Sequence, residues 1–494
     1  MRRTKRHWPA LVLLAFAAIA PFPGRTAAAP LAAALGPEAP MAKAADGFVG
    51  HLSVAPDHGP AGAPVKVEAD GLPPNQEFEL VWRTVKGTWK VNGEEYHGRQ
   101  YQPIAYQIAR VKSDAAGRLA ATFTTPEDFG FSHDIVLQQG DRLFIQAGYS
   151  VDMTVALTPA SGPVGTPIRV DVKGIGWREL ESSWLLLYDN NFTGWLSAVT
   201  TGGSASFTIP ATGRPGDHLL EILHGEFTFA YRNMQQNPEP DRPRFALPFT
   251  ITPGEPVLPP PPEQQAQTSV RNLPAADGAL TTSQPFSGIG RPLVVGGAGF
   301  EPGKAYELSW NTMTGNRVSG GGWEESGKVV AKASADAAGG IAFRFAVPDD
   351  LGGQHRFYVN DDPQHRQGFY WIAPTALPLD VGEGPVGTTF MVHLKGVGWT
   401  ETANIYTIVY DNSYIGYACG FNSQGDVQIF LKATGEPGWH FIDLYPAIYK
   451  GQESRPMNFR IPQLTYAADH PGEDLPAFHF AFDVKGSAGA SAMH

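Results

Sequence analysis

The chain has 494 residues, of which 42% are hydrophobic and 17% charged, and a formal net charge of −11 at pH 7. After removal of an N-terminal leader, about 450 residues predict three or four domains. The low and negative charge excludes a nucleic-acid-binding surface, which needs a dense basic patch.

The N-terminal segment predicts export. Met1–Trp8 is basic, and Pro9–Phe22 is apolar but too short to span a bilayer as a mature helix. Small-residue cleavage sites follow at Ala27–Ala29 and Ala42–Ala44, and the second is favoured because a proline directly follows the first. We expect residues 1–44 to be signal peptide and leader, with no membrane span in the secreted or cell-surface product. A retained N-terminal membrane anchor is the alternative.

A duplicated module is evident in the mature region. Gly-Pro-Val-Gly-Thr occurs at 162–166 and 384–388, an offset of 222 residues (384 minus 162). Three further pairs of blocks share this offset. They are Lys173–Trp177 with Lys395–Trp399, Tyr188–Asn190 with Tyr410–Asn412, and Ala211–His218 with Ala433–His440. Gap-free spacing over four blocks indicates duplication of a structural unit.

A different module type precedes each copy. Gly71–Trp82 parallels Gly299–Trp310 at an offset of 228 (299 minus 71), whereas Pro126–Gly130 parallels Pro348–Gly352 at 222 (348 minus 126). The stretch between Trp82 and Ser113 therefore varies in length. The predicted order is A-B-linker-A-B. Its parts are module A1 (47–152), module B1 (153–253), a Pro-rich linker (254–285), module A2 (286–376), module B2 (377–464) and a C-terminal tail (465–494).

The linker and the tail have distinct compositions. Val257–Pro262 contains four consecutive prolines, which predicts an extended, semi-rigid spacer that separates the two halves like a hinge between beads. In the tail, Phe478–Val484 alternates and could form an edge strand, and we expect Gly486–His494 to be disordered.

Strand periodicity dominates the modules. Pro167–Val172 and Val65–Ala69 alternate with period two, which places one set of side chains on a core. Trp184–Tyr188 and Tyr406–Tyr410 are continuously apolar and predict central strands buried on both sides. Turn signals recur at intervals of about ten residues, as in sandwiches and barrels. The predicted fold class is all-β, with four tandem immunoglobulin-like β-sandwich domains.

The string Leu157–Thr166, followed by a strand and Lys173–Trp177, resembles the opening of IPT/TIG immunoglobulin-like domains. Val54–Ala63 is a looser version, and Gly296–Phe300 retains only the end. The resemblance implies a sandwich found in extracellular and cell-surface proteins as a spacer, adhesion or carbohydrate-associated module. It does not by itself imply catalysis. We expect Trp177 to close one end of its own sandwich.

Aromatic and polar residues in the loops suggest ligand binding. An exposed ring can stack on a sugar while neighbouring amide and carboxylate groups bind its hydroxyls. The candidate binding residues are Trp89, Tyr96, Tyr101, Asp189, Asn190, Trp195, Trp323, Asp411, Asn412, Tyr414 and Tyr417. The alternatives are that the rings pack within their own domains, and that the Asp-Asn pairs form turns or contribute to a calcium site.

Other chemistry has little support. The single cysteine, Cys419, allows no internal disulfide, and we expect it to be a buried thiol. No zinc motif, nucleophile elbow or phosphate loop occurs, so we expect no cofactor, no metal and no enzymatic activity. The favoured function is non-catalytic binding of a polysaccharide, an envelope component or a protein partner. A self-assembling structural stalk and an extracellular hydrolase are the alternatives.

Overall fold

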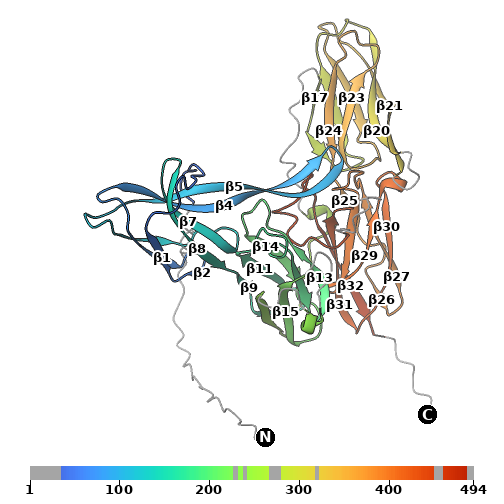
Figure 1. Cartoon of the computed structure of the whole chain (residues 1–494). Coiled ribbons are helices and arrows are strands. Elements are labelled where there is room, and N and C mark those ends of the chain that lie inside the picture. The colour runs from blue at the N-terminus through green and yellow to red at the C-terminus, as the bar shows by residue number, and fades with distance from the viewer. Residues whose placement is uncertain are drawn as a thin grey trace, which may run out of the picture.

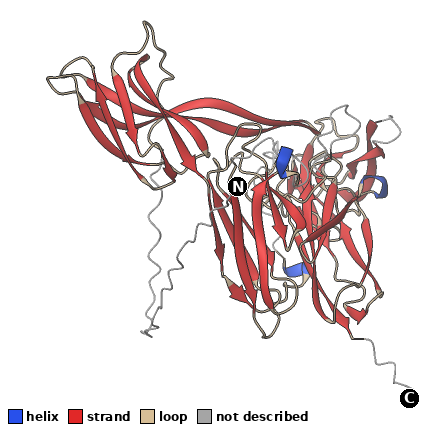
Figure 2. Cartoon of the chain, turned by 60° about the horizontal axis from the view of Figure 1, so that its bottom comes forward, coloured by secondary structure: helices blue, strands red, loops and turns tan. Residues whose placement is uncertain are grey.

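The computed structural model describes residues 35–225, 232–236, 242–265, 280–316, 322–449 and 460–486. Within these ranges the chain is almost entirely β, apart from the short 3-10 helices η1 (Met234–Gln236), η2 (Pro262–Gln264) and η3 (Phe421–Ser423). Figures 1 and 2 show four sandwiches, with A1 at one side and the other three grouped together. The predicted all-β class with four immunoglobulin-like sandwiches is confirmed.

Each module contributes eight strands to the described part of the chain. Those of A1 are β1 (His51–Ala55), β2 (His58–Pro60), β3 (Pro64–Asp70), β4 (Glu77–Asn92), β5 (Glu95–Lys112), β6 (Leu119–Thr124), β7 (Phe131–Gln139) and β8 (Arg142–Asp152). Those of B1 are β9 (Thr154–Thr158), β10 (Ser161–Gly162), β11 (Pro167–Lys173), β12 (Trp184–Tyr188), β13 (Asn191–Leu196), β14 (Ala205–Pro210), β15 (Gly216–His224) and β16 (Arg244–Ile251).

The second half repeats the pattern. The strands of A2 are β17 (Leu280–Thr282), β18 (Phe286–Ser287), β19 (Pro292–Gly297), β20 (Ala305–Asn316), β21 (Gly322–Ser334), β22 (Ile341–Ala346), β23 (Gly353–Val359) and β24 (Gln367–Ile372). Those of B2 are β25 (Thr375–Ala376), β26 (Glu383–Pro385), β27 (Thr389–Lys395), β28 (Ile405–Tyr410), β29 (Ser413–Cys419), β30 (Val427–Lys432), β31 (Gly438–Ala447) and β32 (Phe478–Lys485).

The A and B modules have the same topology. In A1 the three-stranded sheet has the order β1-β3-β6 and the five-stranded sheet β2-β8-β7-β4-β5, and the other modules reproduce both orders. The short second strand pairs in parallel with the eighth, as β2 does with β8. Two facing sheets with strands exchanged between them form an immunoglobulin-like sandwich. The two module types therefore differ in sequence and loop length, not in fold.

The strand patterns explain the cores. β3 alternates between exposed and buried residues, and all five residues of β12 are buried, as predicted. A large aromatic side chain on the fourth strand is fully buried in each module: Trp82, Trp184, Trp310 and Tyr406. Such rings remove much apolar area from water, which each sandwich needs in the absence of disulfides.

The junction between A and B is itself duplicated. In each half the turn before the seventh strand of A bonds to the loop after the third strand of B, and a lysine of B pairs with an acidic residue of A. The contacts are Gly130 N–Ile175 O (3.0 Å) and Lys173 Nζ–Glu127 Oε2 (2.7 Å), and Gly352 N–Val397 O (3.1 Å) and Lys395 Nζ–Asp349 Oδ2 (2.7 Å). The duplicated unit is therefore a fixed A-B pair.

The linker does not act as a free hinge. Val257 N donates to Val164 O of B1 at 2.8 Å, and Gln265 Oε1 accepts from His479 N of B2 at 2.8 Å. The proline segment thus lies between B1 and B2, which also share a hydrophobic cluster. The expected arrangement of beads on a hinge is wrong, because the two B modules pack against each other.

Two predicted boundaries also need correction. A2 begins at β17, so residues 280–285 belong to it rather than to the linker. The segment predicted as a tail contains β32, which lies inside the five-stranded sheet of B2 between β26 and β31 rather than at its edge. B2 therefore extends to Lys485. The residues from 487 onward, expected to be disordered, lie outside the described residues.

The N-terminal boundary changes as well. Most of the predicted signal peptide, residues 1–34, lies outside the described residues, in which no helix is long and apolar enough to cross a bilayer. Residues 36–43, which fall within the predicted leader, pack on A1. Ala39 N donates to Ala105 O at 2.8 Å, Leu143 N donates to Lys43 O at 3.1 Å, and Ala42 is buried.

We expect the exported protein to retain these residues, with cleavage before Gly36 rather than after Ala44. Removal of residues 36–43 would expose the apolar cluster around Val81 and Leu143 and leave backbone groups of A1 unpaired. N-terminal sequencing of the exported protein checks this, and a mature terminus at Ala45 would contradict it. As a control, a chain that starts at Ala45 should unfold at a lower temperature than one that starts at Pro30.

Candidate functional site

The β4–β5 hairpin is the most unusual element of the fold. β4 and β5 contain 16 and 18 residues, against 5 and 6 in the corresponding hairpin of B1. Only Glu79–Arg83 of β4 pairs with β7, so the outer part is a two-stranded ribbon. A ribbon of this kind is marginally stable alone. It crosses B1 and reaches B2 (Figures 1 and 2).

The tip of the hairpin inserts aromatic rings between the two B modules. Trp89 and Tyr96 join a cluster with Leu185 and Trp195 of B1 and Ile448 of B2. The rings of Trp89 and Trp195 meet edge to face, with centroids 6.5 Å apart. This interdomain cluster stabilises the hairpin by burying its apolar end.

Asp469 connects three modules. Its carboxylate accepts hydrogen bonds from Trp89 Nε1 of A1 at 2.9 Å, and from Val199 N (2.8 Å), Thr200 N (2.9 Å) and Thr200 Oγ1 (2.7 Å) of B1. Asp469 itself follows β31 in B2 and is 1% exposed. Four donors replace its lost hydration, which a buried carboxylate requires. We call this arrangement the Asp469 junction.

A second carboxylate holds the end of the hairpin. Glu401 of B2 accepts from Tyr96 N through Oε2 at 2.8 Å, and its own backbone N donates to Glu94 O at 2.9 Å. Closer to A1, Arg99 Nη1 donates to Ser182 Oγ of B1 at 2.9 Å. The hairpin is thus bonded to B1 and B2 along its length.

Gly87 shows how closely the hairpin approaches B1. A Cβ atom built on Gly87 would lie 2.1 Å from Val199 O, closer than any side chain tolerates. Because Val199 also donates to Asp469, a side chain at position 87 would displace the loop that forms the junction. The length-variable stretch thus forms a contact between modules rather than an open loop.

The Tyr-Asp-Asn blocks form hairpin turns. Both central residues have positive φ, 48° and 67° at Asp189 and Asn190 and 47° and 58° at Asp411 and Asn412, as a type I′ turn requires. The turn alternative therefore accounts for these blocks. Among the described residues, no three His, Cys, Asp or Glu side chains are grouped so that they could hold a metal.

Each turn is clamped by a histidine from the matching Ala-Thr-Gly block. His218 Nδ1 lies 2.6 Å from Asp189 Oδ2, and His440 Nδ1 lies 2.5 Å from Asp411 Oδ2. Partial burial lowers the pKa of His440, but the hydrogen bond and charge of Asp411 outweigh it, so that the pKa is raised. The shared spacing of the two blocks thus reflects one structural clamp.

The two turns have diverged in their surroundings. Asn412 is fully buried against B1. Its side-chain Nδ2 donates to Pro210 O at 2.8 Å, and its backbone carbonyl oxygen accepts from Thr193 Oγ1 at 2.6 Å. Asn190, its counterpart, is exposed. Only the second copy of the turn is an interface element.

The predicted binding residues fall into three groups. Tyr96, Trp195 and Asn412 are buried, and Trp89, Tyr101, Trp323, Asp411 and Tyr414 are half-buried, whereas Asp189, Asn190 and Tyr417 are exposed. The structure brings Trp89, Tyr96 and Trp195 together. Buried rings offer no face to a sugar, so the expected stacking role does not fit Tyr96 and Trp195, which pack between domains rather than within their own.

The half-buried aromatics also have protein neighbours. Tyr101 meets Phe129 edge to face at 5.8 Å, and Tyr414 meets Phe192 at 6.2 Å. Trp323 lies 5.5 Å from Trp399 across the A2–B2 junction. Trp177, which we expected to close one end of its own sandwich, also contacts a neighbouring module. Its ring centroid lies 5.0 Å from that of His133 in A1.

Tyr417 retains an accessible ring. It is 41% exposed, and its hydroxyl accepts a hydrogen bond from Arg460 Nη1 at 2.7 Å. On the same strand Cys419 is exposed, which corrects the expected buried thiol. A ligand-binding role for Tyr417 stays a prediction.

A buried set of three side chains, a tryptophan, an aspartate and a histidine, occurs in each A module and was not identified from the sequence. Trp82 Nε1 donates to Asp128 Oδ2 at 2.7 Å and stacks on His133, and Trp310, Asp350 and His355 repeat the arrangement. Burial raises the pKa of the Asp128 carboxyl. The offset of 222 residues between Asp128 and Asp350, and between His133 and His355, was the signal that could have revealed them.

Replacement of Asp469 by Ala should undock the hairpin. The change leaves the donors from Trp89, Val199 and Thr200 unpaired, which costs at least about 3 kcal/mol. We expect a lower unfolding temperature and faster tryptic cleavage at Lys86 and Lys90. The exposed Asp141→Ala variant is the control. Wild-type cleavage rates in D469A would refute the role of the junction.

The His440 clamp predicts a pH-dependent contribution to stability. Because the pKa of His440 is raised in the folded protein, the stabilisation is fully present below its usual value of 6.5 and is lost as the pH rises through the raised value. The deficit in unfolding temperature of His440→Leu should be larger at pH 5.5 than at pH 8.5. The exposed His51→Leu variant serves as control, and a deficit that grows with pH would contradict the assignment.

Comparison with known proteins adds nothing to the strand topology described above. No family model matches the chain, and no curated protein matches it. Among solved structures, a four-domain ICAM-5 ectodomain fragment shows 10% identity over 82% of this chain and 96% of its own, with a TM-score of 0.18. A putative membrane-anchored protein of Corynebacterium diphtheriae shows 10% identity over 65% and 89%, with a TM-score of 0.17. At TM-scores this low the whole chains do not superpose. The immunoglobulin-like class therefore rests on the strand order of the two sheets in each module.

Proposed function

We propose that the protein is a secreted or cell-surface, non-catalytic binding protein that presents exposed residues on a rigid frame of four modules. The Asp469 junction carries this proposal, because it fixes A1, B1 and B2 relative to one another through buried hydrogen bonds. Exposed groups on different modules then keep a constant spacing, so that little conformational entropy is lost when a large partner binds. The basic and apolar N-terminus and the IPT/TIG-like opening of the B modules support an extracellular location.

The partner that we favour is a polysaccharide or another cell-envelope component. Tyr417 provides an exposed ring whose hydroxyl is fixed by Arg460, and the guanidinium lies 5.1 Å from the ring centre. A fixed aromatic face beside hydrogen-bond donors suits a pyranose ring.

A protein partner is the second candidate. Ile415 on the same strand is 51% exposed. An exposed apolar side chain beside an aromatic and an arginine is typical of the centre of a protein interface. This candidate uses the same side of B2 and differs from the first in the chemistry of the partner.

The test is co-sedimentation of the purified protein with insoluble envelope polysaccharides, with wild type, Tyr417→Ala and Phe48→Ala compared. Phe48 is an exposed aromatic of A1 and serves as the matched control. We expect Tyr417→Ala to weaken binding roughly tenfold and Phe48→Ala to leave it unchanged. Undiminished binding by Y417A would exclude this site. Capture of envelope proteins alone would favour the second candidate, and self-assembly without ligand would favour the structural stalk.

A further inference from the structure

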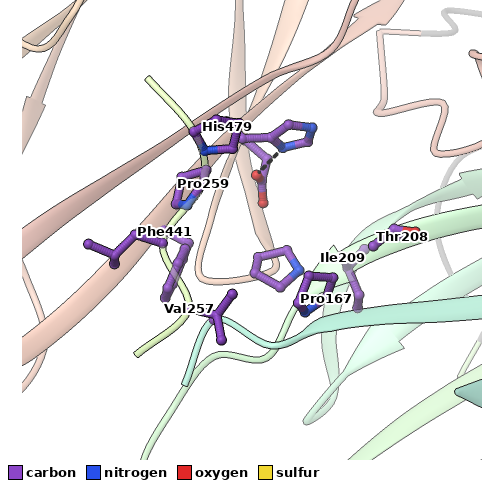
Figure 3. A pocket seen from close by; sticks show the side chains of 12 residues that line it. Pro167, Thr208, Ile209, Val257, Pro259, Phe441 and His479 are labelled. Atoms are coloured by element: carbon purple, nitrogen blue, oxygen red, sulfur yellow. Dashed lines mark hydrogen bonds and ion pairs between the residues drawn. The ribbon is translucent and has the colours of Figure 1, made fainter. Parts of the chain in front are cut away.

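A cavity lies where B1, the linker and B2 meet. Its volume is about 210 Å³, and its walls include Pro167 and Ile209 of B1, Val257 and Pro259 of the linker, and Phe441 of B2. Figure 3 shows these side chains converging from the three segments. Proline rings cannot adjust their backbone to fill a gap, so the space between the modules remains open.

One end of the cavity is polar. Asp443 and His479, paired across β31 and β32, both line it, and His479 Nδ1 lies 2.6 Å from Asp443 Oδ1 (Figure 3). Asp443 is only 2% exposed, and no donor among the described residues reaches its second oxygen, Oδ2. A buried carboxylate oxygen without a donor is costly, so a ligand that supplies one would gain free energy.

The Asp443–His479 pair has no counterpart in B1, so the duplication alone does not explain it. The counterpart of Asp443 in B1 is Glu221 (443 minus 222), which lies opposite Ala246 instead of a histidine. The Asp–His pair therefore exists only where the linker and B1 cover the sheet of B2. Its position is tied to the cavity rather than to the folding of a B module.

We propose that this cavity binds a small, mostly apolar molecule with one hydroxyl group, whose O–H donates to Asp443 Oδ2. The volume lies between that of a cavity that holds benzene, about 150 Å³, and that of pockets for drug-sized ligands, about 300 Å³ or more. A single ring with a short substituent fits this range. A monosaccharide would leave most of its hydroxyls facing apolar walls.

The charge of the site favours a neutral donor over an ammonium group. Burial lowers the pKa of His479, but the hydrogen bond and charge of Asp443 outweigh this and raise it. A protonated His479 neutralises Asp443, so an added cation would carry an unpaired charge into an apolar space. An alcohol supplies the missing hydrogen bond without that cost.

The experiment measures binding of three isosteric probes, benzyl alcohol, ethylbenzene and benzylamine, to the whole protein at pH 6 by calorimetry and ligand-observed NMR. We expect saturable one-to-one binding of benzyl alcohol, roughly tenfold tighter than that of the other two probes. Asp443→Leu should abolish the preference for the alcohol over ethylbenzene while ethylbenzene still binds.

A blocking variant keeps the test independent of the buried carboxylate. Leu258 lines the cavity from the linker and is 43% exposed, so Leu258→Trp can narrow the space without disturbing a core. It should eliminate binding, whereas Val386→Trp at another exposed apolar position should not. Equal affinity for all three probes, tighter binding of benzylamine, undiminished binding by L258W, or no binding of benzyl alcohol up to its solubility limit would each overturn the proposal.

Discussion

The arrangement of this molecule depends on one buried carboxylate. Asp469 receives hydrogen bonds from A1 and B1 while its own chain belongs to B2. Hydrogen bonds to a charged group are about twice as strong as neutral ones, and their geometry is directional. They therefore determine the orientation of the modules, whereas the apolar cluster around Trp89 and Trp195 supplies most of the attraction. A hydrophobic contact alone would allow the sandwiches to slide.

Duplication followed by divergence explains the asymmetry. Both halves keep the A–B contacts and the Asp–His clamp of the B turns, so these features belong to the ancestral unit. The contact of the β4–β5 tip with B2, the buried Asn412 and the Asp443–His479 pair occur in one half only. The features that both halves share hold A and B together within each half. The features found in one half only lie at the contacts between the two halves.

The sequence predicted the sandwiches well because strand periodicity and turn residues are local. β3, β11, β12 and β28 coincide with the predicted strands, and the repeat spacing identified the equivalent blocks. The binding residues were harder to predict from the sequence, because the exposure of an aromatic ring depends on which other modules pack against it. Trp89 and Trp195 carry the same local signal as Tyr417, yet a neighbouring module covers the first two. Nothing near Asp469 in the sequence indicates its donors.

The separation of Trp89 from Asp469 has a consequence for biosynthesis. The two residues are 380 positions apart, so the hairpin is made long before its partner emerges. Domains fold in order from the N-terminus as the chain is made, at about 5–20 residues per second. A1 can thus complete its own core, and B1 can cover one side of the aromatic end of its ribbon, before the last sandwich covers the other side. At these rates the interval between the two residues is roughly 20–80 seconds.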